Sequence, residues 1–392
     1  MSPNLQSSFW ERMGLEKSHG EDCLRAVEEL YPGKLVEEFE YQGYCSFTFR
    51  VSELDYTTVH HSKGGRDPSV GFGSEPRTPD AVVVQIRPTQ HQLDLQTVHA
   101  ASRTYGTFVP KTRNLDHILP ARLLAFELDM MLGIPFSRCQ PSTTILRPST
   151  WSKQVSLVQS FASFMSRAWP SVSNPTCIPR NSRADSPVAE LPTLLSECTG
   201  RVGANIIPKL NKLARHLPDA ALRNRAAEVR DKILELQDYP VVLNHGDLIP
   251  SNVLVHAETW QITGVVDWAE AEWLPFGSCL YGLEHLLGYL DRPESYVAGF
   301  GCTTWRYFSN APGLRDMFWA RLYNECPGLK ERKDDVALAR DLGVLLWYGY
   351  AWDEGAIDRV VNEADDTAEV ECLKTFLRMS GSGKENEASF GP

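Results

Sequence analysis

Apolar and polar residues alternate in the first third of the chain and recur at helical spacing over most of the remainder. Phe47, Phe49 and Val51 alternate with polar neighbours, which is typical of a half-buried strand. The same criterion predicts strands over 34–41, 44–51 and 81–86, the first two joined by Gln42-Gly43. Apolar positions three and four apart predict helices over 93–105, 154–169, 219–236, 281–289, 303–308, 314–322 and 336–352. The pattern predicts an α+β protein with a small antiparallel sheet followed by a larger, mainly helical part.

Breaks in this pattern predict the domain organisation. Residues 1–33 form a helical extension that ends at Pro32-Gly33, and residues 34–137 form a small lobe. Within that lobe, 53–80 is rich in Gly, Ser and Pro without periodicity, which predicts a flexible insertion. We expect a second lobe over 138–380 and a disordered tail over 381–392.

Three short apolar runs between these helices carry polar residues at their ends. The runs 241–244, 253–255 and 262–266 read as strands. Asp247 follows the first run, Asn252 precedes the second, and Asp267 follows the third. We expect all three side chains at the mouth of one hairpin. Carboxylate and amide oxygens suit Mg²⁺, and a carboxylate can orient or deprotonate a hydroxyl, so the set indicates phosphoryl transfer.

This stretch resembles the aminoglycoside phosphotransferase family of the protein-kinase-like superfamily. His245, Gly246, Asp247 and Asn252 match the family motif H-G-D-x-x-x-x-N, and Asp267 falls at its metal-binding Asp. The segments Q-I-R-P and W-L-P-F-G resemble those of the family's fungal members. The resemblance implies a two-lobed kinase-like fold and transfer of the γ-phosphoryl of ATP or GTP, with Mg²⁺, to a small-molecule hydroxyl. It implies catalysis by Asp247, with His245 positioning the loop, and metal binding by Asn252 and Asp267.

The resemblance also implies nucleotide-binding positions in the small lobe. Gly43 and Ser46 would cover the phosphates from a hairpin turn, and Gln85 or Arg87 would hold them from the third strand. Backbone groups of the hinge would face the adenine, namely those of Leu128, Asp129 and Met130. The family's strand-three lysine is replaced by Gln85, and the helix over 93–105 lacks the Glu that pairs with it.

These two departures leave a second interpretation open, a degenerate kinase-like protein that binds a small molecule or a protein partner without catalysis. A third, a metal-dependent phosphohydrolase, would need more carboxylates at strand ends than the sequence has. The sequence does not identify the acceptor substrate. Carboxylates that could line its site after the metal Asp are Glu270, Glu272, Asp353 and Glu354, although each is also typical of a solvated surface.

Composition and charge narrow the class of protein. The net charge of −11 and the absence of a basic stripe argue against a nucleic-acid partner. Nine scattered cysteines without a C-x-x-C pair predict free thiols in a reducing compartment. With neither a secretory signal nor a membrane-spanning run, we expect a cytoplasmic protein. The sequence does not predict the oligomeric state.

Overall fold

The computed structural model describes residues 8–53, 81–117, 119–170, 194–292, 303–353 and 356–378. The chain divides into two compact units, the first from residues 2–99 and 110–132 and the second from 100–109 and 133–392. The predicted insertion and tail fall almost wholly outside the described residues. Among the residues that are described, no helix is long and apolar enough to cross a bilayer.

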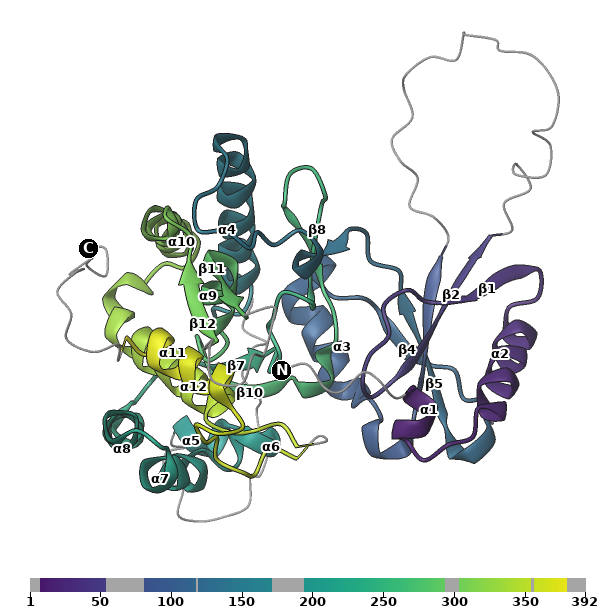
Figure 1. Ribbon diagram of the computed structural model, residues 1–392, viewed down its shortest axis with the longest axis horizontal. Coiled ribbons are helices and arrows are strands. Elements are labelled where there is room, and N and C mark those ends of the chain that lie inside the picture. The colour runs from purple at the N-terminus through teal and green to yellow at the C-terminus, as the bar shows by residue number, and fades with distance from the viewer. Residues whose placement is uncertain are drawn as a thin grey trace, which may run out of the picture. The chain divides into compact units, whose positions relative to one another are not determined.

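The first unit holds a five-stranded antiparallel sheet in the order β1-β2-β3-β5-β4 (Figure 1). Its elements are α1 (Phe9–Arg12), α2 (Ser18–Leu30), β1 (Lys34–Glu38), β2 (Phe47–Glu53), β3 (Val82–Arg87), β4 (Thr112–Asn114) and β5 (Leu124–Asp129). The helix α3 (Leu95–Tyr105) crosses the division between the units. Because the predicted strand 34–41 ends at Glu38, β1 and β2 are joined by a long loop rather than by a two-residue turn.

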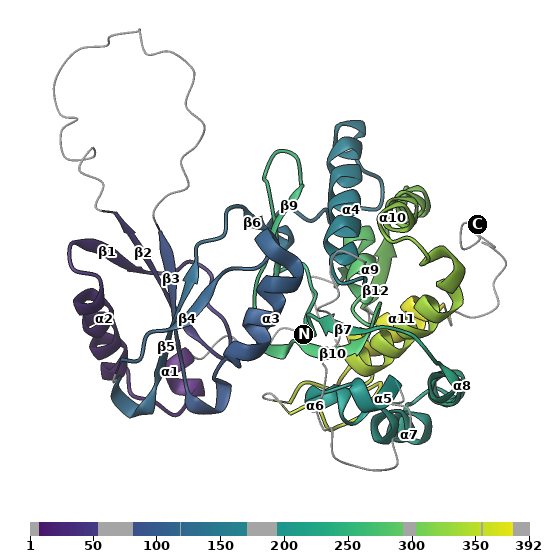
Figure 2. The ribbon, with the colours of Figure 1, turned by 180° about the vertical axis from the view of Figure 1, so that it is seen from behind.

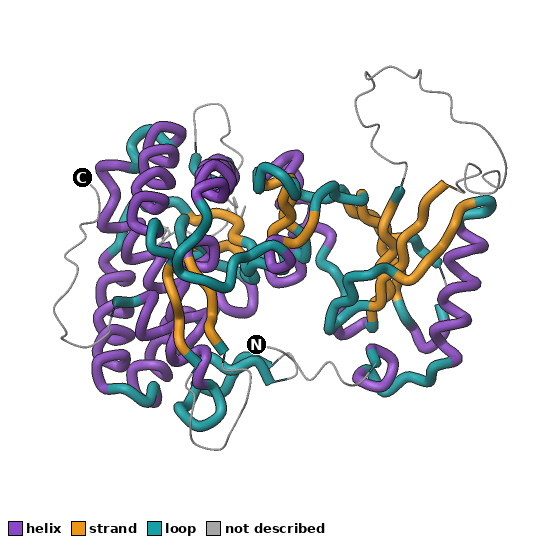
Figure 3. The backbone as a smooth tube through the Cα atoms, turned by 45° about the horizontal axis from the view of Figure 1, so that its top comes forward, coloured by secondary structure: helices purple, strands orange, loops and turns teal. Residues whose placement is uncertain are grey.

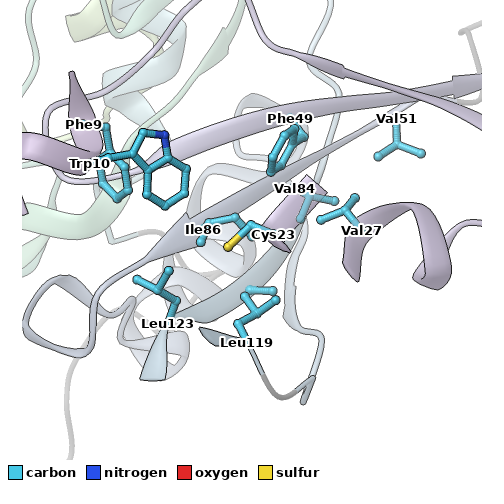
Figure 4. Packing of buried hydrophobic residues seen from close by; sticks show 11 residues of the cluster. Phe9, Trp10, Cys23, Val27, Phe49, Val51, Val84, Ile86, Leu119 and Leu123 are labelled. Carbon is cyan, nitrogen blue, oxygen red and sulfur yellow. The ribbon is translucent and has the colours of Figure 1, made fainter. Parts of the chain in front are cut away.

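The helices α1 and α2 cover one face of this sheet. Phe49, Val84 and their strand neighbours pack against Val27 of α2 and Trp10 of α1 in a continuous apolar cluster (Figure 4). Cross-strand partners share a face, and successive residues alternate between faces. The predicted helical extension is therefore part of the core of the first unit.

The opposite face of the sheet carries polar side chains on β2 and β3 and a phenylalanine on β5. Thr48, Gln85 and Phe126 are cross-strand partners on this face, and Arg50 lies two residues along β2 from Thr48. Residues one position away, such as Phe49 and Val84, belong to the apolar cluster. The sheet thus has one face that builds the core and a second that bears hydrogen-bonding side chains.

The second unit is mainly helical, and the short strands among its described residues form three small sheets (Figures 2 and 3). Its helices are α4 (Trp151–Ser166), α5 (Leu194–Glu197), α6 (Gly200–Gly203), α7 (Ile206–His216), α8 (Ala220–Glu235), α9 (Tyr281–Leu287), α10 (Ala311–Glu325), α11 (Lys333–Tyr348) and α12 (Thr367–Phe376). Its strands are β6 (Ile134–Pro135), β7 (Val241–Asn244), β8 (Val253–Val255), β9 (Ile262–Val265), β10 (Glu272–Pro275), β11 (Gly288–Asp291) and β12 (Thr304–Tyr307). The predicted α+β class is confirmed.

One predicted helix of this unit is shorter than expected, and the prediction of another was wrong. The helix predicted over 281–289 ends at Leu287, and the residues predicted as a helix over 303–308 form β12 instead. The two segments pair as an antiparallel hairpin, in which Gly288 lies opposite Tyr307. A Cβ on Gly288 would lie 2.4 Å from the Arg306 carbonyl oxygen, so glycine permits the close approach of the strands. Local spacing alone does not reveal this pairing.

Candidate active site

The motif residues lie at the ends of strands from two different sheets of the second unit. Strand β7, which leads into His245 and Asp247, pairs with β10, whereas Asn252 and Asp267 flank the β8–β9 hairpin at one end. Asp247 is thus carried by a different sheet from Asn252 and Asp267, but its carboxylate lies at the mouth of the hairpin, where it accepts from the Asn252 amide at 2.9 Å. The Val266 N–H donates to the Asn252 carbonyl oxygen at 2.9 Å, which closes the hairpin beside both polar residues.

His245 joins the two sheets. Its Nε2 donates to the Val266 carbonyl oxygen at 2.8 Å, and its Nδ1 accepts from the Asp247 backbone N–H at 3.2 Å. Both bonds require one neutral tautomer, with the proton on Nε2. Burial lowers the pKa of His245 to about 4, so the ring is neutral near pH 7. With both ring nitrogens bonded to the backbone, His245 sets the geometry of the loop.

Asp247 has an environment that makes its carboxylate a stronger base. Burial, followed by the negative charge of Asp267, raises the pKa of Asp247 to about 7, and a hydrogen bond from Asn252 opposes this rise. The Asn252 amide donates to the Asp247 carboxylate and to its carbonyl oxygen, both at 2.9 Å. The side chain is therefore fixed in place with a proton affinity suited to acid–base chemistry near neutral pH.

Asn252 and Asp267 supply oxygen atoms beside this carboxylate. Asp267 is exposed and has a left-handed backbone with φ 63°, a conformation that Asp adopts more readily than most residues. Asn252 uses its amide nitrogen on Asp247, which leaves the amide oxygen to face another group. Two carboxylates whose charges repel, with an amide oxygen beside them, fit a divalent cation that prefers oxygen ligands. The residues present thus fit Mg²⁺.

Gly246 is required by the path of the catalytic loop. Its φ is +80°, and a Cβ at this position would lie 1.9 Å from the Glu270 carbonyl oxygen. No side chain can occupy that space, because the other atom belongs to the backbone. The glycine of the motif therefore lets the loop between His245 and Asp247 pass directly over the turn that follows Asp267.

Three supporting residues were not found by the sequence reasoning. The Tyr281 hydroxyl accepts from the Leu248 N–H at 3.1 Å, and the Asn244 side chain accepts from the Cys279 N–H at 3.1 Å. The Trp268 ring packs edge-on against the His245 ring with centroids 4.6 Å apart. A polar residue at the end of the apolar run 241–244 was a signal for Asn244. Nothing in the local sequence around Tyr281 indicated its contact.

The predicted phosphate-binding residues lie in the first unit. Gly43 and Ser46 belong to the loop between β1 and β2, and Ser46 is buried. Gln85 is on the polar face of β3, and Arg87, also buried, donates to the Gln85 side chain at 3.1 Å and to the His91 carbonyl oxygen at 3.3 Å. The guanidinium is thus held beside the position where the family has a lysine.

The three predicted hinge residues lie at the end of β5. Leu128 pairs with both β3 and β4, and the Asp129 N–H donates to the Lys111 carbonyl oxygen at 3.0 Å. Met130 is the first of the three beyond the strand. The backbone of Met130 therefore lies outside the strand, whereas the backbones of Leu128 and Asp129 belong to it.

The predicted substrate carboxylates have different environments. Glu270 is exposed, and its charge raises the pKa of Asp247, so it lies close to the catalytic loop. Glu272 is buried and accepts from the backbone N–H groups of residues 201–203 at 2.6 to 3.0 Å. Asp353 forms a two-pronged ion pair with Arg359. Glu354 lies outside the described residues. Glu272 thus has a structural task at the start of α6, and its predicted contact with a substrate stays untested.

Residues 191–278 match the model of a family described as the phosphotransferase enzyme family, which confirms the resemblance over this segment. No curated protein matches the chain significantly. Among solved structures, the chain is similar to an aminoglycoside-3'-phosphotransferase of type VIII, at 16% identity and a TM-score of 0.41 over 83% of this chain and 99% of that one. It is also similar to a macrolide 2'-phosphotransferase from Brachybacterium faecium, at 15% identity and a TM-score of 0.44 over 93% and 100% of the two chains. An aminoglycoside phosphotransferase from Streptomyces rimosus, solved with ADP and streptomycin, is 13% identical with a TM-score of 0.39 over 82% and 97%.

Proposed function

We propose that this protein is a small-molecule phosphotransferase that moves the γ-phosphoryl group of ATP or GTP to a hydroxyl group, with Mg²⁺. The observation that carries the proposal is the fixed Asp247 carboxylate, which accepts from the Asn252 amide at 2.9 Å. The match of residues 191–278 to a phosphotransferase family supports the same reaction class.

Asp247 accepts the proton of the acceptor hydroxyl in this mechanism. A base with a pKa near the working pH is the most effective, and a positioned base contributes roughly 10²- to 10⁴-fold to a rate. Asn252 holds the carboxylate through its amide, and neutral His245 holds the loop backbone. Hence the chain orients the acceptor oxygen and takes its proton, with no charged imidazole involved.

Asn252 and Asp267 would hold Mg²⁺. When bound, the ion neutralises the phosphate oxygens of the nucleotide. The nucleotide itself would meet the polar face of the first unit, with Gly43 and Ser46 near its phosphates and Gln85 with Arg87 in place of the family's lysine. We propose the hinge backbone around Met130 as the adenine contact.

A second function, small-molecule or protein binding without catalysis, is favoured by one observation. The helix α3 has no acidic residue that could pair with a cation on β3, and its His99 bonds to the Thr112 carbonyl oxygen at 3.0 Å. The ion pair that a kinase forms between strand three and this helix therefore cannot form between β3 and α3.

A ligand-binding experiment separates nucleotide-dependent functions from the rest. We expect ATP with Mg²⁺ to raise the unfolding temperature of the wild type by several degrees, since any ligand that binds only the folded state stabilises it. We expect Asp247→Asn to show a similar rise, because asparagine can keep the bond from Asn252. No rise in the wild type with ATP or GTP would overturn the phosphotransferase proposal.

A further inference from the structure

The side chain of Gln42 cross-links the loop over 39–46, which joins β1 to β2. The Gln42 amide nitrogen donates to the Phe39 and Thr48 carbonyl oxygens at 2.9 and 2.8 Å, and its oxygen accepts from the Thr48 N–H at 2.8 Å. These bonds tie Gln42 to Phe39, the first residue of the loop, and to Thr48 in β2. The shape of the loop is thus set by the chain itself.

The helix α1 holds the tip of the same loop from outside. The Arg12 guanidinium donates to the carbonyl oxygens of Gly43 and Tyr44 at 3.3 and 3.4 Å. It also lies over the Tyr44 ring, 4.9 Å from the ring centroid, as in a cation–π contact. These contacts involve Gly43 and Tyr44, which lie in the turn proposed to cover the phosphates.

The position of Arg12 is itself firmly determined. Ser8 and Glu11 form a reciprocal capping box at the start of α1. Phe9 and Trp10 pack against Phe47, the first residue of β2, with ring centroids 5.9 and 4.9 Å apart. Since α1 is fixed both by its cap and by the sheet, Arg12 is presented to the loop by a rigid element.

The orientation of the loop peptides follows from these bonds. The C=O and N–H groups of a trans peptide point in opposite directions. Carbonyl oxygens of Gly43 and Tyr44 that face Arg12 therefore turn the next two N–H groups toward the other side of the loop. Gly43 brings its backbone close to the buried Ser46, since a Cβ there would lie 3.0 Å from the Ser46 hydroxyl. Successive N–H groups with one orientation are typical of anion-binding turns.

We propose that Arg12 is a positioning residue for nucleotide binding, which orients the 39–46 loop toward the phosphates without contacting them. The inference rests on the proposed function, because the loop has this task only if the protein binds a nucleotide. It assigns the N-terminal extension a part in nucleotide affinity in addition to its part in the core.

The test compares Arg12→Met with the wild type in calorimetric titrations with Mg-ATP and with adenosine. Arg25→Met, on the exposed side of α2, is the matched control. We expect Arg12→Met to weaken Mg-ATP binding about fivefold or more, a change of about 1 kcal/mol, and to leave adenosine within about twofold. We expect faster amide hydrogen exchange over 39–48 in the same variant and no change in Arg25→Met.

Each other outcome overturns a defined claim. Equal Mg-ATP affinity of Arg12→Met and wild type would overturn the positioning role and leave the phosphotransferase proposal intact. Equal weakening of adenosine and Mg-ATP would reduce Arg12 to a structural residue, and unchanged exchange over 39–48 would show that it does not hold the loop. A wild type that binds neither Mg-ATP nor Mg-GTP would overturn the proposed function and the inference with it.

Discussion

At the scale of single residues, the candidate site depends on backbone contacts that the motif itself does not display. His245 is bonded through both ring nitrogens to the backbone, at Val266 and at Asp247. A proton acceptor with no free nitrogen is poorly suited to act as a base, whereas the Asp247 carboxylate has its pKa raised to about 7. We propose that these two polar residues of the motif have different roles, with His245 positioning the loop and Asp247 acting as the base.

Replacement of Gly246 by alanine tests the close approach in the catalytic loop. The added Cβ would meet the Glu270 carbonyl oxygen and would need a left-handed backbone. We expect Gly246→Ala to destabilise the protein by about 2 to 4 kcal/mol in urea unfolding, from strain and overpacking together. Gly328 has a similar φ of +83° with nothing within 4 Å of its Cβ position, so Gly328→Ala should cost only about 1 kcal/mol. Equal losses in the two variants would refute the contact.

The sequence predicted the candidate catalytic and metal-binding side chains but not the contacts that hold them in place. Asp247, Asn252 and Asp267 were recognisable because their types and spacing suit phosphoryl transfer. Tyr281 and Trp268 support the same loop from positions whose roles depend on packing between elements. Arg12 lies 31 and 32 residues before Gly43 and Tyr44, the two loop residues that it contacts, so no local pattern links them.

At the scale of elements, α9 carries a buried ionic cluster. Glu284 accepts from Arg340 at 2.9 Å, from Arg315 at 2.6 Å and from the Tyr307 hydroxyl at 2.8 Å. Despite burial, which acts to raise it, the pKa of Glu284 is lowered to about 2 by the positive charges of Arg315 and Arg340. The cluster connects α9, β12, α10 and α11 in the second unit.

We expect Glu284→Gln to lower the free energy of unfolding by about 3 to 5 kcal/mol, because Arg315 loses its carboxylate partner and the buried Arg340 keeps only Asp341 as a counter-ion. The matched control is Asp291→Asn, which breaks an exposed ion pair with Arg306 and should cost about 0.5 kcal/mol. Urea unfolding at pH 7 measures both variants. A Glu284→Gln loss as small as that of the control would contradict the stabilising role of the cluster.

His285, the next residue of α9, predicts a pH dependence of stability. Contacts with Trp305, Tyr348 and Phe376 enclose its ring, and burial lowers its pKa to about 4 from the ordinary 6.5. The unfolded state therefore binds the proton more tightly. The stabilisation is fully present above pH 6.5 and is lost as the pH falls from 6.5 toward 4. The loss is about 2 kcal/mol at pH 5 and about 3 kcal/mol at pH 4.

The measurement is urea unfolding at pH 7 and at pH 5. In His285→Gln, we expect the loss of stability between these two values to be smaller than in the wild type. The exposed His216→Gln is the matched control and should keep the wild-type loss. An unchanged loss in His285→Gln would contradict the assignment of the pH dependence to this ring.

Helices and strands were predictable from sequence where turn and capping residues mark their ends. They were less predictable where pairing between strands determines the secondary structure. The strands β7 and β8 occur with the predicted bounds, and Asp219 caps α8 as expected, since its side chain accepts from Ala221 and Leu222 N–H groups. The segment of β12 has apolar residues at a spacing that suits a helix, but pairing with β11 makes it a strand. Similarly, the long loop between β1 and β2 is stabilised by Gln42, which reads in sequence as an ordinary turn residue.

At the scale of the whole molecule, the proposed reaction divides its requirements between the two units. The first unit presents a polar sheet face and a loop held by Arg12, and the second presents Asp247 with its oxygen-bearing neighbours. The order of a small antiparallel sheet followed by a helical part was predictable from the change in hydrophobic period. The acceptor substrate was not predictable, because the predicted substrate carboxylates have different environments. Glu270 is exposed, whereas Glu272 is bonded to backbone N–H groups of its own chain.

The most direct test of the central claim is Mg²⁺-dependent release of ADP from ATP, or of GDP from GTP, in the presence of a panel of small hydroxyl compounds. We expect at least one acceptor to stimulate release by the wild type, and Asp247→Asn to lower that rate about 10²- to 10⁴-fold while its nucleotide affinity stays within about twofold. Equal release by the wild type and Asp247→Asn would contradict the assignment of Asp247 as the catalytic base.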